Sequence, residues 1–305
     1  MQVPPPHTGA ASLVLGGGGF AGPHLVAELS CEGDVAAPSR AELDLTDAEA
    51  LRGAVRETQP GAVFHLAAFS SPRLSWEQPR EAVMSNVEMT LNVLEAVREE
   101  APAARVVLVS SGQVYETRGP GPVTEASALD PPSPYAVSKA ASDLLGAQYA
   151  SGHSLKVVRV RPFNHAGPGQ SEEYVLSTLA RQVAEAETRG DAEAVLRTGD
   201  TSAARDFTDV RDVVHAYALA AGAEPGVYNI CSGRCTTVAE LIDLLRGCAA
   251  VPVRHKVDPD RLRTNDAQAI RGSHDKLTAA TGWEPRIALE QTVRDTLEWW
   301  RSQLA

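Results

Sequence analysis

The sequence predicts a doubly wound α/β fold, in which helices cover both faces of a parallel sheet. Two observations support this prediction. The first 165 residues alternate short, β-branched apolar runs with helical stretches, which is the pattern of repeated βαβ units. The chain of 305 residues is also long enough for two domains or one large α/β unit, at about 150 residues per domain.

The first half of the chain supplies the parallel sheet. Its expected strands are apolar runs at Ser12–Leu15, Asp34–Ala37, Ala62–Leu66, Arg105–Ser110 and Lys156–Val160. Helices are expected between them, at Gly22–Leu29, Asp47–Thr58, Glu81–Glu99 and Tyr135–Ser151. In the third helix, Leu91, Leu94 and Arg98 lie at positions i, i+3 and i+7, the spacing of one half-buried face. Right-handed crossovers between such strands place them in one sheet.

The pattern changes after Arg161-Pro162. Residues Asn164–Gln170 are rich in glycine and proline, which predicts a loop. Later helices are expected at Tyr174–Thr188, Val210–Gly222, Val238–Cys248 and Leu289–Gln303, and strands at Ala194–Arg197 and Val227–Ile230. We therefore expect a first domain in residues 1–163, to which 203–230 return, and a smaller α/β substrate-binding domain in 164–202 and 231–305.

Composition and charge exclude several classes of protein. With 43% hydrophobic and 22% charged residues the chain is ordinary for a globular protein, and no apolar run reaches the roughly 18–20 residues of a membrane span. Met1–Gly9 has no basic segment typical of a secretory signal. Four cysteines form neither a disulfide framework nor a zinc pattern, so no metal is expected. A net charge of −11 disfavours nucleic acid and anionic membranes as partners, and we expect a soluble cytoplasmic protein.

A run of glycines follows the first expected strand. Gly17, Gly19 and Gly22 satisfy G-x-G-x-x-G, and Gly16, Gly19 and Gly22 satisfy G-x-x-G-x-x-G. Such a turn brings the backbone close to a pyrophosphate, which then meets the N–H groups at the helix start. A plain βα turn is the alternative, because four consecutive glycines match many templates. The strand before and the helix after favour a Rossmann-type dinucleotide site.

The end of the second strand indicates which dinucleotide binds. A site for NAD has an acidic residue there to bind the ribose hydroxyls. Here Pro38-Ser39-Arg40 follows the strand, and the first carboxylate is Glu42. Arg40 can hold a 2′-phosphate with two hydrogen bonds, with the Ser39 hydroxyl beside it. NADP(H) is therefore favoured over NAD(H), and a solvated loop arginine is the alternative.

A serine, a tyrosine and a lysine together suggest redox chemistry. Tyr135 and Lys139 in the sequence YAVSK lie at i and i+4 on one helix face, and Ser110-Ser111 ends the preceding strand. The lysine ammonium and an oxidised nicotinamide would lower the pKa of the tyrosine, which can then exchange a proton with a carbonyl or alcohol. The serine hydroxyl would polarise the same oxygen. A buried tyrosine on a surface helix is the alternative.

With these motifs, the sequence resembles the extended short-chain dehydrogenase/reductase family. The resemblance rests on GGGGFAG (16–22), HLAA (65–68), SSGQVY (110–115), YAVSK (135–139) and RDFTDVRDVV (205–214). It implies that Ser111 is the catalytic hydroxyl, Tyr135 the acid/base and Lys139 the residue that binds the ribose and tunes the tyrosine. It further implies a cofactor groove formed by Gly16, Gly19, Phe20, Gly22, Leu66, Ala67 and Ala68, with Asp44 and Leu45 at the adenine end.

Within the family, two positions separate the possible reactions. Dehydratases of nucleotide sugars carry a glutamate, often after another acid, where this chain has Gly112 and Gln113. Neither a glycine nor an amide can remove the C5 proton or help to expel the C6 hydroxyl. The resemblance therefore favours hydride transfer alone, and FNHxGPGQ at 163–170 resembles reductases of the GDP-6-deoxymannose branch.

By the same resemblance, the substrate lies against residues from both halves of the chain. Asn164 would bind the sugar or pyrophosphate, and Arg205 and Arg263 would bind the diphosphate, because a guanidinium reaches two phosphate oxygens at once. The chain departs from the branch at Arg263-Thr-Asn-Asp266, where the reductases read Arg-Pro-x-acid. The remaining expected substrate contacts are Ser70, Ser111, Gly112 and Ala180, the last within the backbone segment expected to hold the base.

The resulting expectation is an NADPH-preferring reductase of a GDP-linked sugar, converting GDP-4-keto-6-deoxy-D-mannose to GDP-D-rhamnose. A nucleotide-sugar 4-epimerase is the first alternative; a 4,6-dehydratase and a catalytically silent dinucleotide-binding sensor are more remote. The family resemblance also implies a homodimer.

Overall fold

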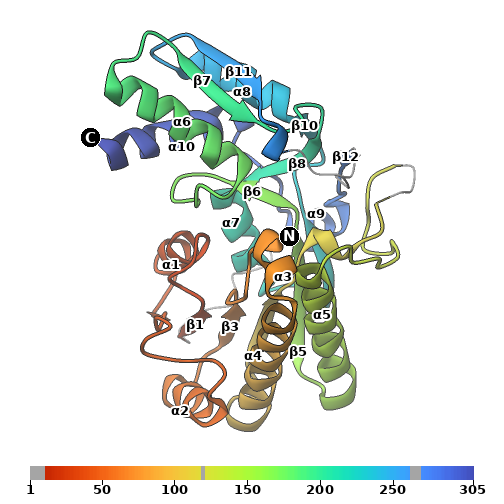
Figure 1. The fold of residues 1–305 in the computed structure, drawn as a ribbon. Helices are drawn as coiled ribbons and strands as arrows, with labels where there is room; N and C mark the ends of the chain where they lie inside the picture. Colours follow the sequence, from red (N-terminus) through yellow and green to blue (C-terminus); the bar gives the residue numbers. More distant parts are fainter. Residues whose placement is uncertain (1–10, 118–120, 262–268) are drawn as a thin grey trace.

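The computed structural model describes residues 11–117, 121–261 and 269–305 (Figure 1). A six-stranded parallel sheet forms its larger unit, in the order β2-β1-β3-β4-β5-β9. Its strands are β1 (Ser12–Leu15), β2 (Val35–Ala36), β3 (Ala62–His65), β4 (Arg105–Val109), β5 (Lys156–Pro162) and β9 (Gly226–Ile230). The connection reverses direction between β1 and β3, and ligands bind at such switch points, beyond the carboxyl ends of the strands.

Helices cover both faces of this sheet, so the predicted fold class is confirmed. One face packs against α1 (Gly22–Leu29) and α7 (Val210–Ala220). The other packs against α2 (Ala48–Thr58), α4 (Pro79–Glu100) and α5 (Pro134–His153), with the short α3 (Pro72–Glu77) at its upper end in Figure 1. The start of α5 is sharply defined, because the Ser133 hydroxyl accepts from the N–H of Ala136 and Pro134 occupies the first turn.

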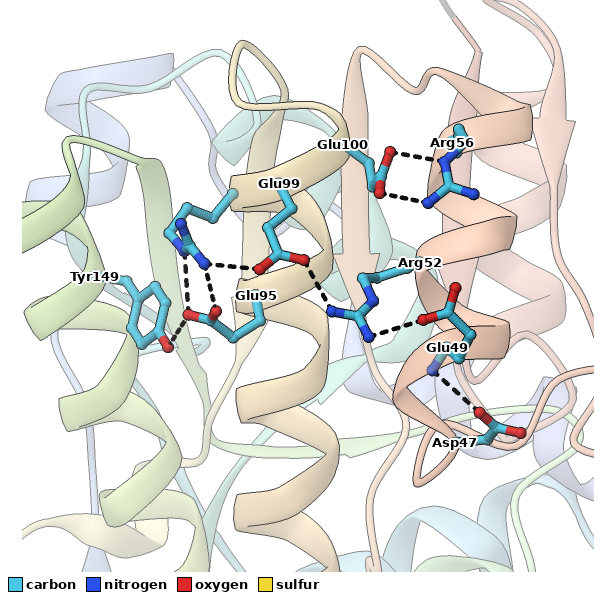
Figure 2. A network of polar contacts seen from close by, with 9 residues as sticks. Asp47, Glu49, Arg52, Arg56, Glu95, Glu99, Glu100 and Tyr149 are labelled. Carbon is cyan, nitrogen blue, oxygen red and sulfur yellow. Dashed lines mark hydrogen bonds and ion pairs between the residues drawn. The ribbon is translucent and has the colours of Figure 1, made fainter.

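A polar network holds α2, α4 and α5 together (Figure 2). Arg52 of α2 bonds Glu49 on its own helix and Glu99 on α4, while Arg56 forms a bidentate pair with Glu100. On the other side of α4, Glu95 accepts from Arg98 and from the hydroxyl of Tyr149 on α5. These contacts supplement the apolar core beneath them and fix the relative positions of the three helices.

The remaining elements form a smaller α/β unit that lies above the sheet in Figure 1. One small sheet has the order β10-β8-β12, with β6 also paired to β8, and β11 pairs β7 in another. These strands are β6 (Asn164–Ala166), β7 (Ala194–Thr198), β8 (Ala204–Asp209), β10 (Cys235–Thr237), β11 (Val253–Val257) and β12 (Ala269–Ile270). The helices are α6 (Val175–Arg189), α8 (Val238–Cys248) and α10 (Leu289–Leu304), whereas α9 (Asp275–Thr281) packs against β9 and α7 in the larger unit.

Two details differ from the sequence predictions. The segment 164–170 is not entirely a loop, because β6 pairs with β8 at its start. Of residues 203–230, α7 and β9 pack in the larger unit, whereas β8 belongs to the small sheet. We keep the division into two domains as a proposal, with the returning segment beginning at Val210. None of the helices in the described ranges is both long and apolar enough to cross a membrane.

Candidate active site

A cavity of about 540 Å³ opens at the carboxyl edge of the large sheet. Its walls come from the glycine turn after β1, the ends of β3, β4 and β5, the start of α5, and β6 of the smaller unit. This is where the switch point between β1 and β3 predicts a ligand. The expected ligand residues that line it are Gly16, Gly19, Phe20, Gly22, Arg40, Asp44, Leu45, Leu66, Ala67, Ala68, Ser70, Ser111, Gly112, Tyr135, Lys139 and Asn164.

The glycine turn has the shape that a dinucleotide pyrophosphate requires. Gly16 has φ +94°, and a Cβ there would lie 2.5 Å from the backbone nitrogen of Ala67. A Cβ on Gly22 would lie 2.2 Å from the carbonyl oxygen of Gly17, so only glycine lets α1 start this close to the turn. No side chain caps the N-terminus of α1, and within the described residues the N–H groups of Phe20 and Ala21 meet no acceptor. An anion fits this end of the helix.

The segment after β2 carries one cationic side chain, Arg40, and two acidic ones, Glu42 and Asp44. Arg40 is exposed, lines the cavity and lies close enough to Asp44 to lower the pKa of that carboxyl, although hydrogen bonds from Thr46 contribute more. Ser39 does not line the cavity, and its N–H donates to Glu42 at 2.8 Å, so its expected role beside a 2′-phosphate is not supported. The Glu42 carboxylate therefore lies beside Ser39, although it comes after the end of the strand in the sequence.

The three expected catalytic residues meet at the other end of the cavity. Ser111 follows β4 and lies close enough to the Tyr135 phenol to lower its pKa, and Tyr135 and Lys139 lie one turn apart on α5. Lys139 is buried and its ammonium donates to the carbonyl oxygen of Val109 at 2.8 Å. The Ser110 hydroxyl donates to the Lys139 carbonyl at 3.2 Å, which ties β4 to α5. A carbonyl oxygen between Ser111 and Tyr135 would therefore meet two hydroxyl donors.

Protonation of this site differs from the expectation. Burial raises the pKa of Tyr135 to about 12, despite the hydrogen bond from Ser111, and burial lowers the pKa of Lys139 to about 8. The predicted lowering of the tyrosine pKa is therefore not found in the protein alone, because the loss of water around the phenol outweighs the other effects. At neutral pH the phenol carries its proton and the lysine retains most of its charge.

The expected substrate residues fall into three groups. Ser70, Gly112 and Asn164 line the cavity. Ala180 lies on α6, is fully buried and does not line the cavity, so its expected contact with the base stays a prediction that the cavity lining does not support. Arg263 lies outside the described residues.

Arg205 is positioned by strand register. In the parallel pairs, Arg205 lies beside Ile270, and Phe207, two residues further along β8, lies beside Asn164. Paired residues point to the same face of a sheet, and both Ile270 and Asn164 line the cavity. Arg205 does not line the cavity, and Phe207 on the same face of β8 is buried in the core of the smaller unit, so the expected diphosphate contact of Arg205 stays a prediction.

The ring of Phe163 leaves no room for a side chain at position 112. A Cβ at this position would lie 2.8 Å from the ring of Phe163, and Gln113 follows with its amide on the cavity wall. An acidic side chain at position 112 would displace Phe163 and with it the adjoining Asn164. The packing thus explains why this site carries no carboxylate at position 112.

Several cavity residues were not predicted from the sequence. His165 was left open between a substrate contact and a bond within its own loop; its ring stacks on Phe20 and Nδ1 lies 3.2 Å from the Phe163 carbonyl oxygen. Tyr174 and Tyr217 also line the cavity, from the start of α6 and from α7. No spacing in the sequence marks either tyrosine, because each reaches the cavity through the packing of a helix.

Comparisons with known proteins place this geometry among nucleotide-sugar enzymes. The family model described as GDP-mannose 4,6 dehydratase matches residues 32–296. GDP-6-deoxy-D-mannose reductase of Pseudomonas aeruginosa is 36% identical, covering 96% of this chain and 97% of that protein. The structure of RMD from the same organism, complexed with NADPH, has a TM-score of 0.89 at 34% identity, covering 96% and 99%. UDP-glucose 4-epimerase of Mycolicibacterium smegmatis is 30% identical, covering 96% and 99%.

Proposed function

Since this chain belongs to the GDP-mannose 4,6 dehydratase family of extended short-chain dehydrogenases/reductases, we propose that it is an NADPH-dependent reductase of a GDP-linked 4-keto-6-deoxyhexose. Its reaction would convert GDP-4-keto-6-deoxy-D-mannose to GDP-D-rhamnose, that is, GDP-6-deoxy-D-mannose. One observation carries the proposal: the cavity joins Ser111, Tyr135 and Lys139 to the amide of Gln113, with no carboxylate at the two positions after the catalytic hydroxyl. The similarity to the Pseudomonas reductase supports the choice of sugar.

Tyr135, Ser111 and Lys139 have separate roles in this reaction. A bound NADPH would supply the hydride to C4. Tyr135 donates its proton to the C4 oxygen, and the Ser111 hydroxyl holds that oxygen through a second hydrogen bond. Lys139 binds the ribose and places a positive charge near the phenolate that remains. Water then returns a proton to Tyr135, so that one hydride and one proton have reduced the ketone to an alcohol.

Epimerisation is the second candidate, because an epimerase is among the similar proteins. Such an enzyme keeps NAD tightly bound and starts by oxidising an alcohol, which requires Tyr135 to accept a proton. The raised pKa of Tyr135 favours the protonated form, which suits donation to a ketone. Arg40 on the cavity wall likewise favours a cofactor with a 2′-phosphate.

The pH dependence of turnover tests the protonation states proposed for Tyr135 and Lys139. For a reductase we expect activity to be highest near neutral pH and to decline as pH rises through about 8, because Lys139 loses its charge while Tyr135 stays protonated. Activity limited by formation of a Tyr135 phenolate would instead rise with pH. Initial rates of NADPH oxidation from pH 6 to 10 measure this, and a profile that rises above pH 8 would contradict proton donation by a protonated Tyr135 beside a charged Lys139.

We further propose that two copies associate through α4 and α5. Met84 and Leu91 repeat at i, i+7 on α4, and Val137 and Leu144 do so on the adjacent α5. With Trp76 on α3, they make up five of the seven exposed large apolar side chains of the described residues. The polar network of Figure 2 holds the two helices in place, so this face is preformed for a second copy.

Leu144→Glu tests this interface. The leucine is 57% exposed in the single chain, so the fold should tolerate the change, while two buried glutamates would face each other across a dimer. We expect the wild type to run as a dimer and the variant as a monomer in light scattering. Val195→Glu, an equally exposed position on β7, should remain dimeric. A monomeric wild type, or an unchanged variant, would argue against this face.

A cytoplasmic location is also part of the proposal. All four cysteines are unpaired, as expected in a reducing compartment.

A further inference from the structure

Tyr217 carries a hydroxyl that the proposed reaction does not use. The side chain lies on α7, is 1% exposed and lines the cavity. The chain has six tyrosines, and all of them lie in the described residues. Four of the other hydroxyls have hydrogen-bond partners: Asn229 for Tyr115, Glu95 for Tyr149, the Ser70 carbonyl for Tyr174 and the Glu224 carbonyl for Tyr228. The fifth, that of Tyr135, is the expected proton donor of the reaction and lies near Ser111. Among the described residues the Tyr217 hydroxyl has no hydrogen-bond partner, and it is not one of the fully buried unpartnered polar atoms, so it is open to the cavity.

The direction of this side chain follows from the helix. α7 starts at the carboxyl edge of the sheet, and helical side chains lean toward the N-terminus of their helix, so the phenol points back to that edge. His215, two residues earlier, faces the opposite side and pairs with Glu28 of α1. The ring of Tyr217 packs in the core below β4 and β5, with Val107 and Val160.

The hydroxyl thus reaches the end of the cavity where the catalytic residues lie. Val109 and Pro162, at the ends of β4 and β5, line the cavity there together with Tyr217. Burial and the nearby Tyr135 phenol raise the pKa of Tyr217, so its hydroxyl is protonated at neutral pH and can donate. Within the protein this donor has no acceptor, so a ligand in the cavity that supplies one gains a hydrogen bond.

The parts of a dinucleotide indicate which acceptor that is. The adenine end belongs near Asp44 and Leu45, the pyrophosphate at the start of α1, and the ribose at Lys139. The Ser111 and Tyr135 hydroxyls are taken by the sugar C4 oxygen. Among these parts of the dinucleotide, the carboxamide of the nicotinamide ring is the strongly polar group that has not yet been assigned a partner side chain. It belongs at the same end of the cavity as the catalytic residues.

We propose that the Tyr217 hydroxyl donates a hydrogen bond to the nicotinamide carboxamide oxygen and thereby fixes which face of the ring meets the substrate. This inference rests on the cofactor part of the proposed function. Tyr217 is then a positioning residue for hydride transfer, placed on the side of the sheet opposite to Tyr135.

The test compares two ligands in the absence of any sugar substrate. The dissociation constants of NADPH and of 2′,5′-ADP, which lacks the nicotinamide half, are measured by fluorescence titration and competition. For Tyr217→Phe we expect NADPH to bind about 3- to 10-fold more weakly, the loss of one hydrogen bond, and 2′,5′-ADP to bind as in the wild type. The melting temperature without ligand should not fall, because the hydroxyl has no partner to lose.

Tyr228→Phe is the matched control. It removes a hydroxyl that bonds the Glu224 carbonyl at 3.0 Å on a buried ring outside the cavity lining, so both affinities should stay unchanged. Unchanged NADPH affinity in Tyr217→Phe would overturn the inference, and so would an equal loss for both ligands, which indicates a structural role. A wild type that binds no NADPH would instead overturn the proposed cofactor. If the protein binds NADPH but does not reduce the 4-keto sugar, this test still applies, because it uses no sugar substrate.

Discussion

Replacing Tyr135 with phenylalanine is expected to lower kcat by about 10² to 10⁴-fold, while the dissociation constant of NADPH changes by less than about twofold. In the proposed reaction this hydroxyl donates its proton to the C4 oxygen, and Ser111 lies near it in the cavity. The ring itself remains, so the start of α5 and the cofactor groove keep their shape. Single-turnover rates with the 4-keto sugar and a separate NADPH titration measure the two quantities.

Lys139→Met provides the contrast for this variant. Its ammonium is expected both to bind the cofactor ribose and to support the tyrosine, so kcat and NADPH affinity should fall together. Turnover within tenfold of the wild type in Tyr135→Phe would rule out Tyr135 as the proton donor. A parallel loss of NADPH binding in that variant would assign the tyrosine to the cofactor rather than to the substrate.

Arg40→Ala is expected to weaken NADPH binding by about 10- to 100-fold and NADH binding by less than about threefold. A guanidinium on the cavity wall can form charge-assisted hydrogen bonds with a 2′-phosphate, and each such bond is stronger than a neutral one. NADH has no phosphate at this position. Titrations of the two cofactors with wild type and variant give the ratio directly.

Glu42→Gln is the matched variant, and its expected effect on NADPH binding is opposite to that of Arg40→Ala. Its carboxylate accepts the N–H of Ser39 at 2.8 Å, so a negative charge sits beside the expected phosphate. An uncharged amide there should strengthen NADPH binding and leave NADH unchanged. Equal losses for both cofactors in Arg40→Ala would remove this residue from the 2′-phosphate site.

The sequence predicted the large sheet well, and the expected catalytic residues line one cavity, because both depend on local patterns in the sequence. Buried parallel strands such as Ala62–His65 are continuous apolar runs, and the glycine turn and YAVSK are local motifs. The small sheet was harder, because β8 mixes charged and apolar residues and β6 begins a segment dominated by glycine and proline. Its pairing depends on contacts between segments far apart in the sequence.

Side-chain positions within the cavity were only partly predictable. The motif-based residues line the cavity, whereas Ala180 is buried because α6 turns that face to its own core. Ser39 holds Glu42 instead of facing the cavity, which only the loop geometry reveals. Without a cofactor the pKa of Tyr135 is raised, because burial of the phenol outweighs the other effects, and the sequence does not show how buried that phenol is.

The central claim is that the protein reduces a GDP-linked 4-keto sugar, and nicotinamide oxidation tests it most directly. Purified protein is mixed with GDP-4-keto-6-deoxy-D-mannose and either NADPH or NADH, and absorbance at the reduced nicotinamide band is followed. We expect one equivalent of NADPH to be oxidised for each equivalent of sugar, faster than NADH. No oxidation of either cofactor, with the sugar recovered as an epimer or unchanged, would contradict the assignment as a reductase.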